Sequence, residues 1–288
     1  TISKKGFAEV GEWTEDGMNW VKAGELPEPL AYGGSFSVNG EMLTAGGNNG
    51  KETVADVFRI VPLGGGLMAL PSTPLPFPVE QAGYACDGNL IYIAGGLTPE
   101  GVSGKGISGK VSDLGIQWTE IADMPEPLVQ PIAFVAGDAL YVWGGFDPDA
   151  KSVSSKGWRL SLGSREWEYA GEGPSGETFA GAAAAVLADG RAVAVGGVDK
   201  DVFTHGLSAA GEAKAAYMTM DPEDYRFNRK LRIFDPEEGR WTSAGEDGAL
   251  ALAGAGIASD GKTTYITGGE IKPGIRTTGT WKLEIPVK

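Results

Sequence analysis

Paired glycines recur along this chain, and each pair ends a short apolar run. Gly-Gly directly follows residues 42–45, 91–94, 141–143, 193–195 and 265–267. Counted from the first glycine of each pair, the spacings are 49, 49, 52 and 72 residues. A period of about 50 residues indicates one supersecondary unit that is repeated, and such units bury their apolar faces against one another. The glycine pairs therefore constrain the chain to a repeat architecture.

Each repeat has the pattern of four short strands separated by turns. A tryptophan follows most pairs, at Trp118, Trp167 and Trp241, and Trp20 begins the same pattern near the N-terminus. A turn and then a strand of small residues, such as 31–38, precede the next Gly-Gly. The pattern resembles the kelch repeat, which is one blade of a β-propeller. It predicts an all-β fold in which residues 1–288 form a single propeller domain with five countable blades.

The last repeat supplies only three strands before the chain ends. Its third strand is expected near residues 280–285, and 65 residues separate Gly269 from Gly47 when they are counted through the two termini. This length suffices for one blade but not for two. We therefore expect a ring that is closed between N- and C-terminal strands, with the segment that begins at Trp20 as the outermost strand of the last blade.

The charge of the chain excludes several classes of partner. With 24 Lys and Arg against 38 Asp and Glu, the net charge is −14. A concentrated basic surface is needed to bind nucleic acid or an anionic membrane, so neither is expected as a partner. No run of apolar residues is long enough to predict a transmembrane helix.

One cysteine and one histidine limit the chemistry further. Cys86 cannot form an internal disulfide, and with His205 it cannot make up a zinc site of the Cys/His type. A copper radical oxidase on a kelch scaffold would need two histidines, and a Ser-His-Asp triad would have to use His205. We therefore expect no metal and no cofactor. The chain begins at Thr1 and shows no signal peptide.

Two segments depart from plain turn chemistry on the rim where the Gly-Gly turns and the loops between blades meet. The spacing of 72 residues contains an insertion at about residues 201–228, with a helix expected near 209–218. A long insertion in a compact repeat is usually functional, although its lone His205 is interpreted as a structural or surface residue. In the second segment, Pro273-Gly274 forms a tight turn that can bring Glu270 and Arg276 to one side of the loop. This pair is either a surface ion pair or a proton-transfer carboxylate beside an anion-binding guanidinium.

Two motifs extend the resemblance beyond the kelch repeat. The segment 223–236, with its Glu-Asp-Tyr-Arg-Phe-Asn start, and the segment 269–277, with Gly-Glu-Ile-Lys-Pro-Gly-Ile-Arg-Thr, resemble the N-acetylneuraminate epimerase (sialic acid mutarotase) family. In that family the second motif lies mid-chain, whereas here it lies in the last repeat. The chain therefore resembles a cyclically permuted mutarotase, in a family whose propellers have six blades.

The resemblance implies an isomerase that interconverts the α and β anomers of N-acetylneuraminate, an anionic sugar. It implies Glu270 as the acid/base and Arg276 as the ligand of the sugar carboxylate, which are the two catalytic residues. Asn228, Arg229 and Gln130 are implied as substrate-binding residues. The family is periplasmic, so a periplasmic or secreted location is implied, and a homodimer stays open. Ring opening needs only positioned proton transfer, which agrees with the expectation of no cofactor.

Two other functions stay open from the residues alone. A kelch propeller can be a non-catalytic module that binds a protein or a glycan, because a fold does not determine a function. A sialidase would need a cluster of arginines and Ser-x-Asp-x-Gly repeats, and residues 259–261 do not fit that repeat. The Glu270 to Arg276 loop and the insertion favour the mutarotase, because a simple interaction module requires neither.

Overall fold

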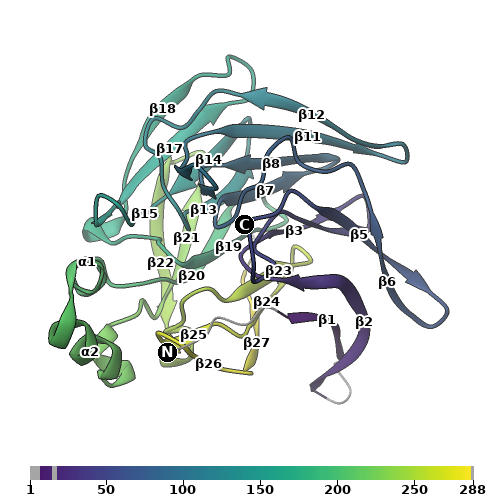
Figure 1. Ribbon diagram of the computed structural model, residues 1–288. Helices are drawn as coiled ribbons and strands as arrows, with labels where there is room; N and C mark the ends of the chain where they lie inside the picture. Colours follow the sequence, from purple (N-terminus) through teal and green to yellow (C-terminus); the bar gives the residue numbers. More distant parts are fainter. Residues whose placement is uncertain (1–6, 15–17, 287–288) are drawn as a thin grey trace. The chain divides into compact units, whose positions relative to one another are not determined.

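The computed structural model describes residues 7–14 and 18–286 (Figure 1). The chain divides into two compact units, Thr1–Asp123 and Met124–Lys288, which are considered separately below. Apart from the parallel pairing of β2 with β6 in the first unit, the blade sheets of both units are antiparallel, and their strands follow one another along the chain, as in the blades of a propeller. Among the described residues, no helix is long and apolar enough to cross a membrane.

The described residues of the first unit form two blade sheets and one short hairpin. From the outermost strand inward, the first sheet consists of β1 (Phe7–Thr14), β2 (Asn19–Leu30), β6 (Gly66–Pro71), β5 (Val57–Leu63), β4 (Glu41–Ala45) and β3 (Gly34–Val38). The second sheet consists of β12 (Gly115–Ile121), β11 (Gly106–Ser112), β8 (Leu90–Ala94) and β7 (Gly83–Asp87), and the hairpin consists of β9 (Leu97–Thr98) and β10 (Gly101–Val102).

The two inner strands β3 and β7 lie against each other. Residues alternate between buried and exposed along β3, so that Phe36 and Val38 face the core. They pack with Ile91 and Ile107 of the second sheet. This alternation is the period of a strand with one buried face, and the packing joins the two blades.

The expectation that the Trp20 segment completes the last blade is wrong. Trp20 lies in β2, which forms a hairpin with β1 and joins the first sheet through a short parallel pairing with β6. Glycine explains this pairing, because a Cβ at Gly24 would lie 2.1 Å from the carbonyl oxygen of Leu67. Only a residue without a side chain allows β2 to approach β6 so closely.

The second unit contains three blade sheets. The first is β13 (Ile132–Ala136), β14 (Ala139–Trp143), β17 (Lys156–Ser161) and β18 (Trp167–Glu172), and the second is β19 (Ala182–Val186), β20 (Ala192–Gly196), β21 (Lys230–Asp235) and β22 (Arg240–Glu246). The third has three strands among the described residues, β23 (Gly256–Ser259), β24 (Thr263–Thr267) and β27 (Thr280–Glu284). With the two sheets of the first unit, they make the five blades that the glycine pairs predicted, and the fold class is the expected all-β propeller arrangement.

Short elements connect the strands of the second unit. The rim hairpins are β15 (Phe146–Asp147) with β16 (Ser152–Val153) and β25 (Glu270–Lys272) with β26 (Ile275–Arg276). The helices are α1 (Lys200–Ser208) and α2 (Gly211–Thr219), and the 3-10 turns are η1 (Pro174–Gly176), η2 (Pro222–Tyr225) and η3 (Gly248–Leu250).

Aromatic side chains fill the core between the first two blades of the second unit. Phe179, in the loop between these blades, lies with its ring centroid 4.4 Å from that of Trp241. Trp241 is one of the recurring tryptophans, so the periodic signal marks a residue that packs one blade on the next. The aromatic members of this core are Phe134, Tyr141, Trp143, Phe179, Phe234 and Trp241.

The Gly-Gly pairs permit close contact between a blade and the following loop. At Gly196 the φ angle is +70°, and a Cβ would lie 2.3 Å from the carbonyl oxygen of Leu252. The N–H of Gly197 donates to that same oxygen over 2.8 Å. The close approach requires glycine here, and glycine also adopts the left-handed backbone without strain.

Candidate functional site

Glu270 begins a short hairpin on the rim of the last blade. It is the first residue of β25 and lies opposite Arg276 of β26, as the Pro273-Gly274 turn predicted. Its backbone forms two hydrogen bonds with Ala253, from Glu270 N to Ala253 O over 2.7 Å and from Ala253 N to Glu270 O over 2.9 Å. The loop before the innermost strand therefore holds the backbone of Glu270 in place.

The carboxylate of Glu270 and the guanidinium of Arg276 lie in contact. Arg276 Nε is 3.8 Å from Glu270 Oε1, and the side chains are 53% and 31% exposed, respectively. The N–H of Gly274 donates to Glu270 Oε2 over 3.3 Å. Since 3.8 Å is too long for a hydrogen bond, Glu270 does not hold the guanidinium in a bidentate pair. The carboxylate is oriented by its own turn, and both groups are partly open to solvent.

Two helices occupy the insertion between β20 and β21. The helix expected near residues 209–218 is α2, whereas α1 was not predicted. The side chain of Asp199 caps α1 by accepting from the N–H groups of Asp201 and Val202. His205 is exposed in the last turn of α1, where a basic side chain complements the helix dipole.

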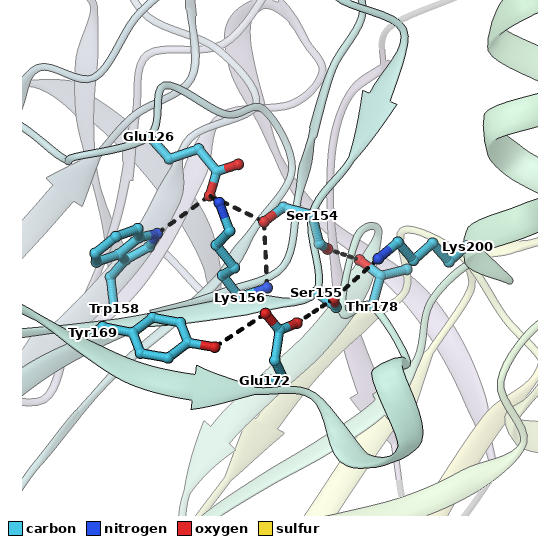
Figure 2. Close-up of polar contacts among 9 residues, drawn as sticks. All are labelled: Glu126, Ser154, Ser155, Lys156, Trp158, Tyr169, Glu172, Thr178 and Lys200. Atoms are coloured by element: carbon cyan, nitrogen blue, oxygen red, sulfur yellow. Dashed lines mark hydrogen bonds and ion pairs between the residues drawn. The ribbon is translucent and has the colours of Figure 1, made fainter.

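The start of α1 is anchored to the β15–β16 hairpin of the neighbouring blade. Lys200 Nζ donates to Ser155 Oγ over 3.1 Å, and Ser155 donates in turn to the carboxylate of Glu172. Figure 2 shows this chain of contacts, which continues to the hydroxyl of Tyr169. The hydrogen bond from Ser155 lowers the pKa of Glu172. In addition, the ring of Phe203 packs edge-on against Phe146 of the hairpin at 4.9 Å.

A second polar group lies beside this anchor. Glu126 Oε2 accepts from Ser154 Oγ over 3.1 Å and from the indole N–H of Trp158 over 3.4 Å (Figure 2). Lys156 Nζ is 3.5 Å from the same oxygen. These contacts fix the loop that precedes the blade to its β15–β16 hairpin.

The other end of the insertion is anchored to the hairpin that carries Glu270. Lys272 Nζ donates to the carbonyl oxygen of Met220 over 3.0 Å, and η2 lies against β25. The insertion therefore extends from the rim hairpin of one blade to the rim hairpin that holds the candidate acid/base. Sequence reasoning missed this contact, because its acceptor is a main-chain oxygen that any residue provides.

Asn228 and Arg229 lie where the insertion returns to β21. The N–H of Asn228 donates to the carbonyl oxygen of Gly197 over 2.9 Å, and its side-chain oxygen accepts from the N–H of Lys230 over 3.0 Å. The carbonyl oxygen of Arg229 accepts from the N–H of Asp247 over 2.9 Å, and its side chain is exposed. Asn228 thus attaches the C-terminal end of the insertion to the Gly-Gly turn at Gly197, whereas the guanidinium of Arg229 faces solvent.

Gln130 belongs to an arc of left-handed residues that precede the innermost strands. Its φ angle is +52°, and its carbonyl oxygen accepts from the N–H of Gly181 over 3.1 Å. The carbonyl oxygen of Gly181 accepts from the N–H of Gly254 over 2.7 Å, and Ala253 pairs with Glu270. The backbone therefore connects Gln130 to Glu270 through two glycines. In the first unit, Tyr32 and Gln81 make the equivalent contact.

Across residues 7–14 and 18–286, no three side chains of His, Cys, Asp or Glu are grouped so that they could hold an ion. The chemistry that the rim offers is a carboxylate and a guanidinium on one hairpin, beside a helical insertion.

These features define a kelch-type propeller protein with a candidate acid/base carboxylate beside a guanidinium on one rim. The profile of the N-acetylneuraminate epimerase family matches residues 73–288. The chain belongs to this family, as the two motifs indicated.

Individual relatives agree with this assignment. The N-acetylneuraminate epimerase of Yersinia pestis (strain Pestoides F) is 30% identical over an alignment of 230 residues, which covers 74% of this chain and 56% of that protein. That of Escherichia coli O9:H4 (strain HS) is 31% identical over an alignment of 235 residues, which covers 75% of this chain and 60% of that protein. The chain thus spans between 56% and 60% of the length of these relatives.

A solved structure shows the same fold. The structure of YjhT aligns with a TM-score of 0.64 and 28% sequence identity, and the alignment covers 75% of this chain and 65% of that chain. The match supports the propeller architecture that the glycine pairs predicted.

Proposed function

We propose that this protein is a mutarotase that interconverts the α and β anomers of N-acetylneuraminate. The observation that carries the proposal is the contact between Glu270 and Arg276 on a rim hairpin, in a chain of the N-acetylneuraminate epimerase family. Such a pair supplies a base for a hydroxyl and a cation for the carboxylate of an anionic sugar.

The proposed reaction is an acid–base ring opening. The carboxylate of Glu270 takes the proton of the anomeric hydroxyl, the bond from the anomeric carbon to the ring oxygen breaks, and the ring oxygen takes a proton from water. The open-chain ketone then rotates, and the same steps in reverse close the ring on its other face. Positioned proton transfer contributes about 10²–10⁴-fold to a rate, which is a suitable range for a reaction that also proceeds unaided.

Arg276 is assigned to the sugar carboxylate in this proposal. The net charge of −14 repels an anionic sugar over the whole molecule, so a local cation is needed to bind it. The guanidinium is half exposed and lacks a hydrogen bond to Glu270, which leaves its donors suited to a carboxylate. Asn228, Arg229 and Gln130 are proposed as further contacts of the sugar.

An NMR time course tests the proposal. Freshly dissolved α-N-acetylneuraminate is followed with and without the protein, at a pH where the uncatalysed change takes minutes. We expect the approach to anomeric equilibrium to accelerate in proportion to the protein concentration. Binding of the sugar without acceleration would instead support the non-catalytic kelch module, and neither binding nor acceleration would contradict both.

A further inference from the structure

We infer that Lys272 is a positioning residue, which caps the C-terminus of α2 and thereby holds the insertion over the hairpin of Glu270. Its ammonium donates to the carbonyl oxygen of Met220, the residue at the C-cap of α2. This inference rests on the proposed function for its kinetic part only. The contact itself can be tested without any activity.

Helix α2 is held by a small number of contacts, among them a hydrogen bond from Lys214 Nζ to the carbonyl oxygen of Gly206 in α1 over 2.7 Å. It has nine residues, of which only Tyr217 is buried, and its N-cap Ala210 makes no side-chain hydrogen bond. Isolated helices of this length are marginal in water, so α2 depends on contacts with the rest of the insertion and the rim. One such contact is the hydroxyl of Tyr225, which donates to the carbonyl oxygen of Tyr217.

The position of Lys272 suits the end of this helix. The last carbonyl groups of a helix lack intrahelical partners, and the C-terminus carries a partial negative charge. Met220 itself has an extended backbone with a ψ of 153°, so its carbonyl group is not aligned with the helix axis. Lys272 satisfies that carbonyl and places its ammonium beside the C-terminus of α2. Lys272 lies two residues after Glu270 in β25. The same short strand therefore carries the candidate base and the lysine that anchors the insertion.

The loss of the contact between Lys272 and Met220 should therefore displace the insertion more than it displaces Glu270. The backbone of Glu270 is held by Ala253, and its carboxylate by the N–H of Gly274. Neither contact involves Lys272. Under the proposed function, binding of the sugar by Asn228 and Arg229 at the end of the insertion should then weaken while proton transfer at Glu270 continues.

Hydrogen exchange tests the anchor directly in the full chain. In Lys272→Met, amides of residues 211–221 should exchange about tenfold faster, as expected for the loss of a hydrogen bond from a charged donor. Lys272→Arg keeps a cationic donor and should restore most of the protection. Lys262→Met is the matched control, because Lys262 lies in the turn between β23 and β24 of the same blade and is exposed. Unchanged exchange in Lys272→Met would overturn the inference.

Kinetics then separate positioning from a merely structural role. For N-acetylneuraminate, Lys272→Met should raise KM about tenfold and change kcat less than about threefold, and Lys272→Arg should recover KM. A fall in kcat with KM unchanged would contradict the assignment. If the wild-type protein lacks mutarotase activity, the proposed function fails, whereas the exchange experiment still decides the anchor.

Discussion

At the scale of single residues, Glu270 and Arg276 differ in what holds them. The carboxylate of Glu270 accepts from the N–H of Gly274, and its backbone pairs with Ala253. The side chain of Arg276 is more exposed, and its Nε lies 3.8 Å from the carboxylate. A base held by its own turn, beside a more exposed cation, suits a division in which Glu270 moves protons and Arg276 binds the substrate.

Glu270→Gln should abolish most of the turnover and leave affinity nearly unchanged. The amide keeps the shape and the acceptor oxygen of the carboxylate but cannot take a proton. We expect kcat to fall by about 10²–10⁴-fold, with KM within about threefold of the wild-type value, in the NMR assay. A variant with wild-type kcat would exclude Glu270 as the base.

Arg276→Ala should act mainly on binding. The loss of hydrogen bonds to a charged group costs about 1.5–3 kcal/mol, so KM should rise by about 10- to 100-fold. Arg276→Lys should restore only part of the affinity, because an ammonium cannot bind a carboxylate in a bidentate way. N-acetylmannosamine, which lacks the carboxylate, should bind wild type and Arg276→Ala equally poorly. If both sugars weakened alike, Arg276 would only shape the loop.

At the scale of elements, the arc of left-handed residues before the innermost strands distinguishes one blade from another. Tyr32, Gln81 and Gln130 hold φ angles of 63°, 57° and 52°, so side chains are compatible with this backbone. The equivalent residues of the last two blades are Gly181 and Gly254. The conformation does not demand glycine. We therefore interpret the missing side chains at Gly181 and Gly254 as space in which the proposed sugar can bind.

Gly254→Gln tests this room. A Cβ at Gly254 would have no atom within 4 Å, and the residue follows Ala253, which pairs with Glu270. The variant should fold, because Gln81 and Gln130 adopt the same conformation, but kcat/KM should fall at least about tenfold. Gly137→Gln is the control, since Gly137 has a φ of 61°, equally open surroundings and a place in the β13–β14 turn. Equal losses of activity in both variants would indicate strain rather than obstruction.

The anchor of α1 gives a pH dependence. The pKa of Glu172 is lowered, chiefly by the hydrogen bond from Ser155 and also by Lys200, from an ordinary value of 4.5. A lowered pKa in the folded state stabilises the protein above the unfolded pKa, and this contribution is lost as pH falls through the folded pKa. The wild-type protein should therefore melt at a higher temperature than Glu172→Gln at pH 7, and this difference should decline below about pH 4.5. A difference that did not vary with pH would show that the charge of Glu172 is irrelevant.

At the scale of the whole chain, sequence periodicity predicted the number of blades correctly but not which strand forms the outer edge of a blade. Gly-Gly pairs and recurring tryptophans follow from contacts that recur between repeats, such as those of Gly47 with Val79 and of Gly197 with Leu252, and are therefore visible as a period. The turn at Pro273-Gly274 likewise predicted the pairing of Glu270 with Arg276. The pairing of β2 with β6 occurs once and depends on Gly24, so it leaves no periodic pattern in the sequence from which it could be predicted. The anchor at Lys272 was hidden for a different reason, since its acceptor is a backbone oxygen.

The net charge gives the last prediction, which concerns salt. At −14 the chain repels an anionic sugar from a distance, whereas Arg276 attracts it at contact. Salt at 0.1 M screens charges beyond about 10 Å and affects a close contact much less, so repulsion should weaken more than attraction. KM for N-acetylneuraminate should therefore fall, by about two- to threefold, between 10 and 150 mM NaCl, and in Arg276→Ala the fall should persist. A KM that rises with salt would mean that local attraction by cations outweighs the charge of the whole molecule.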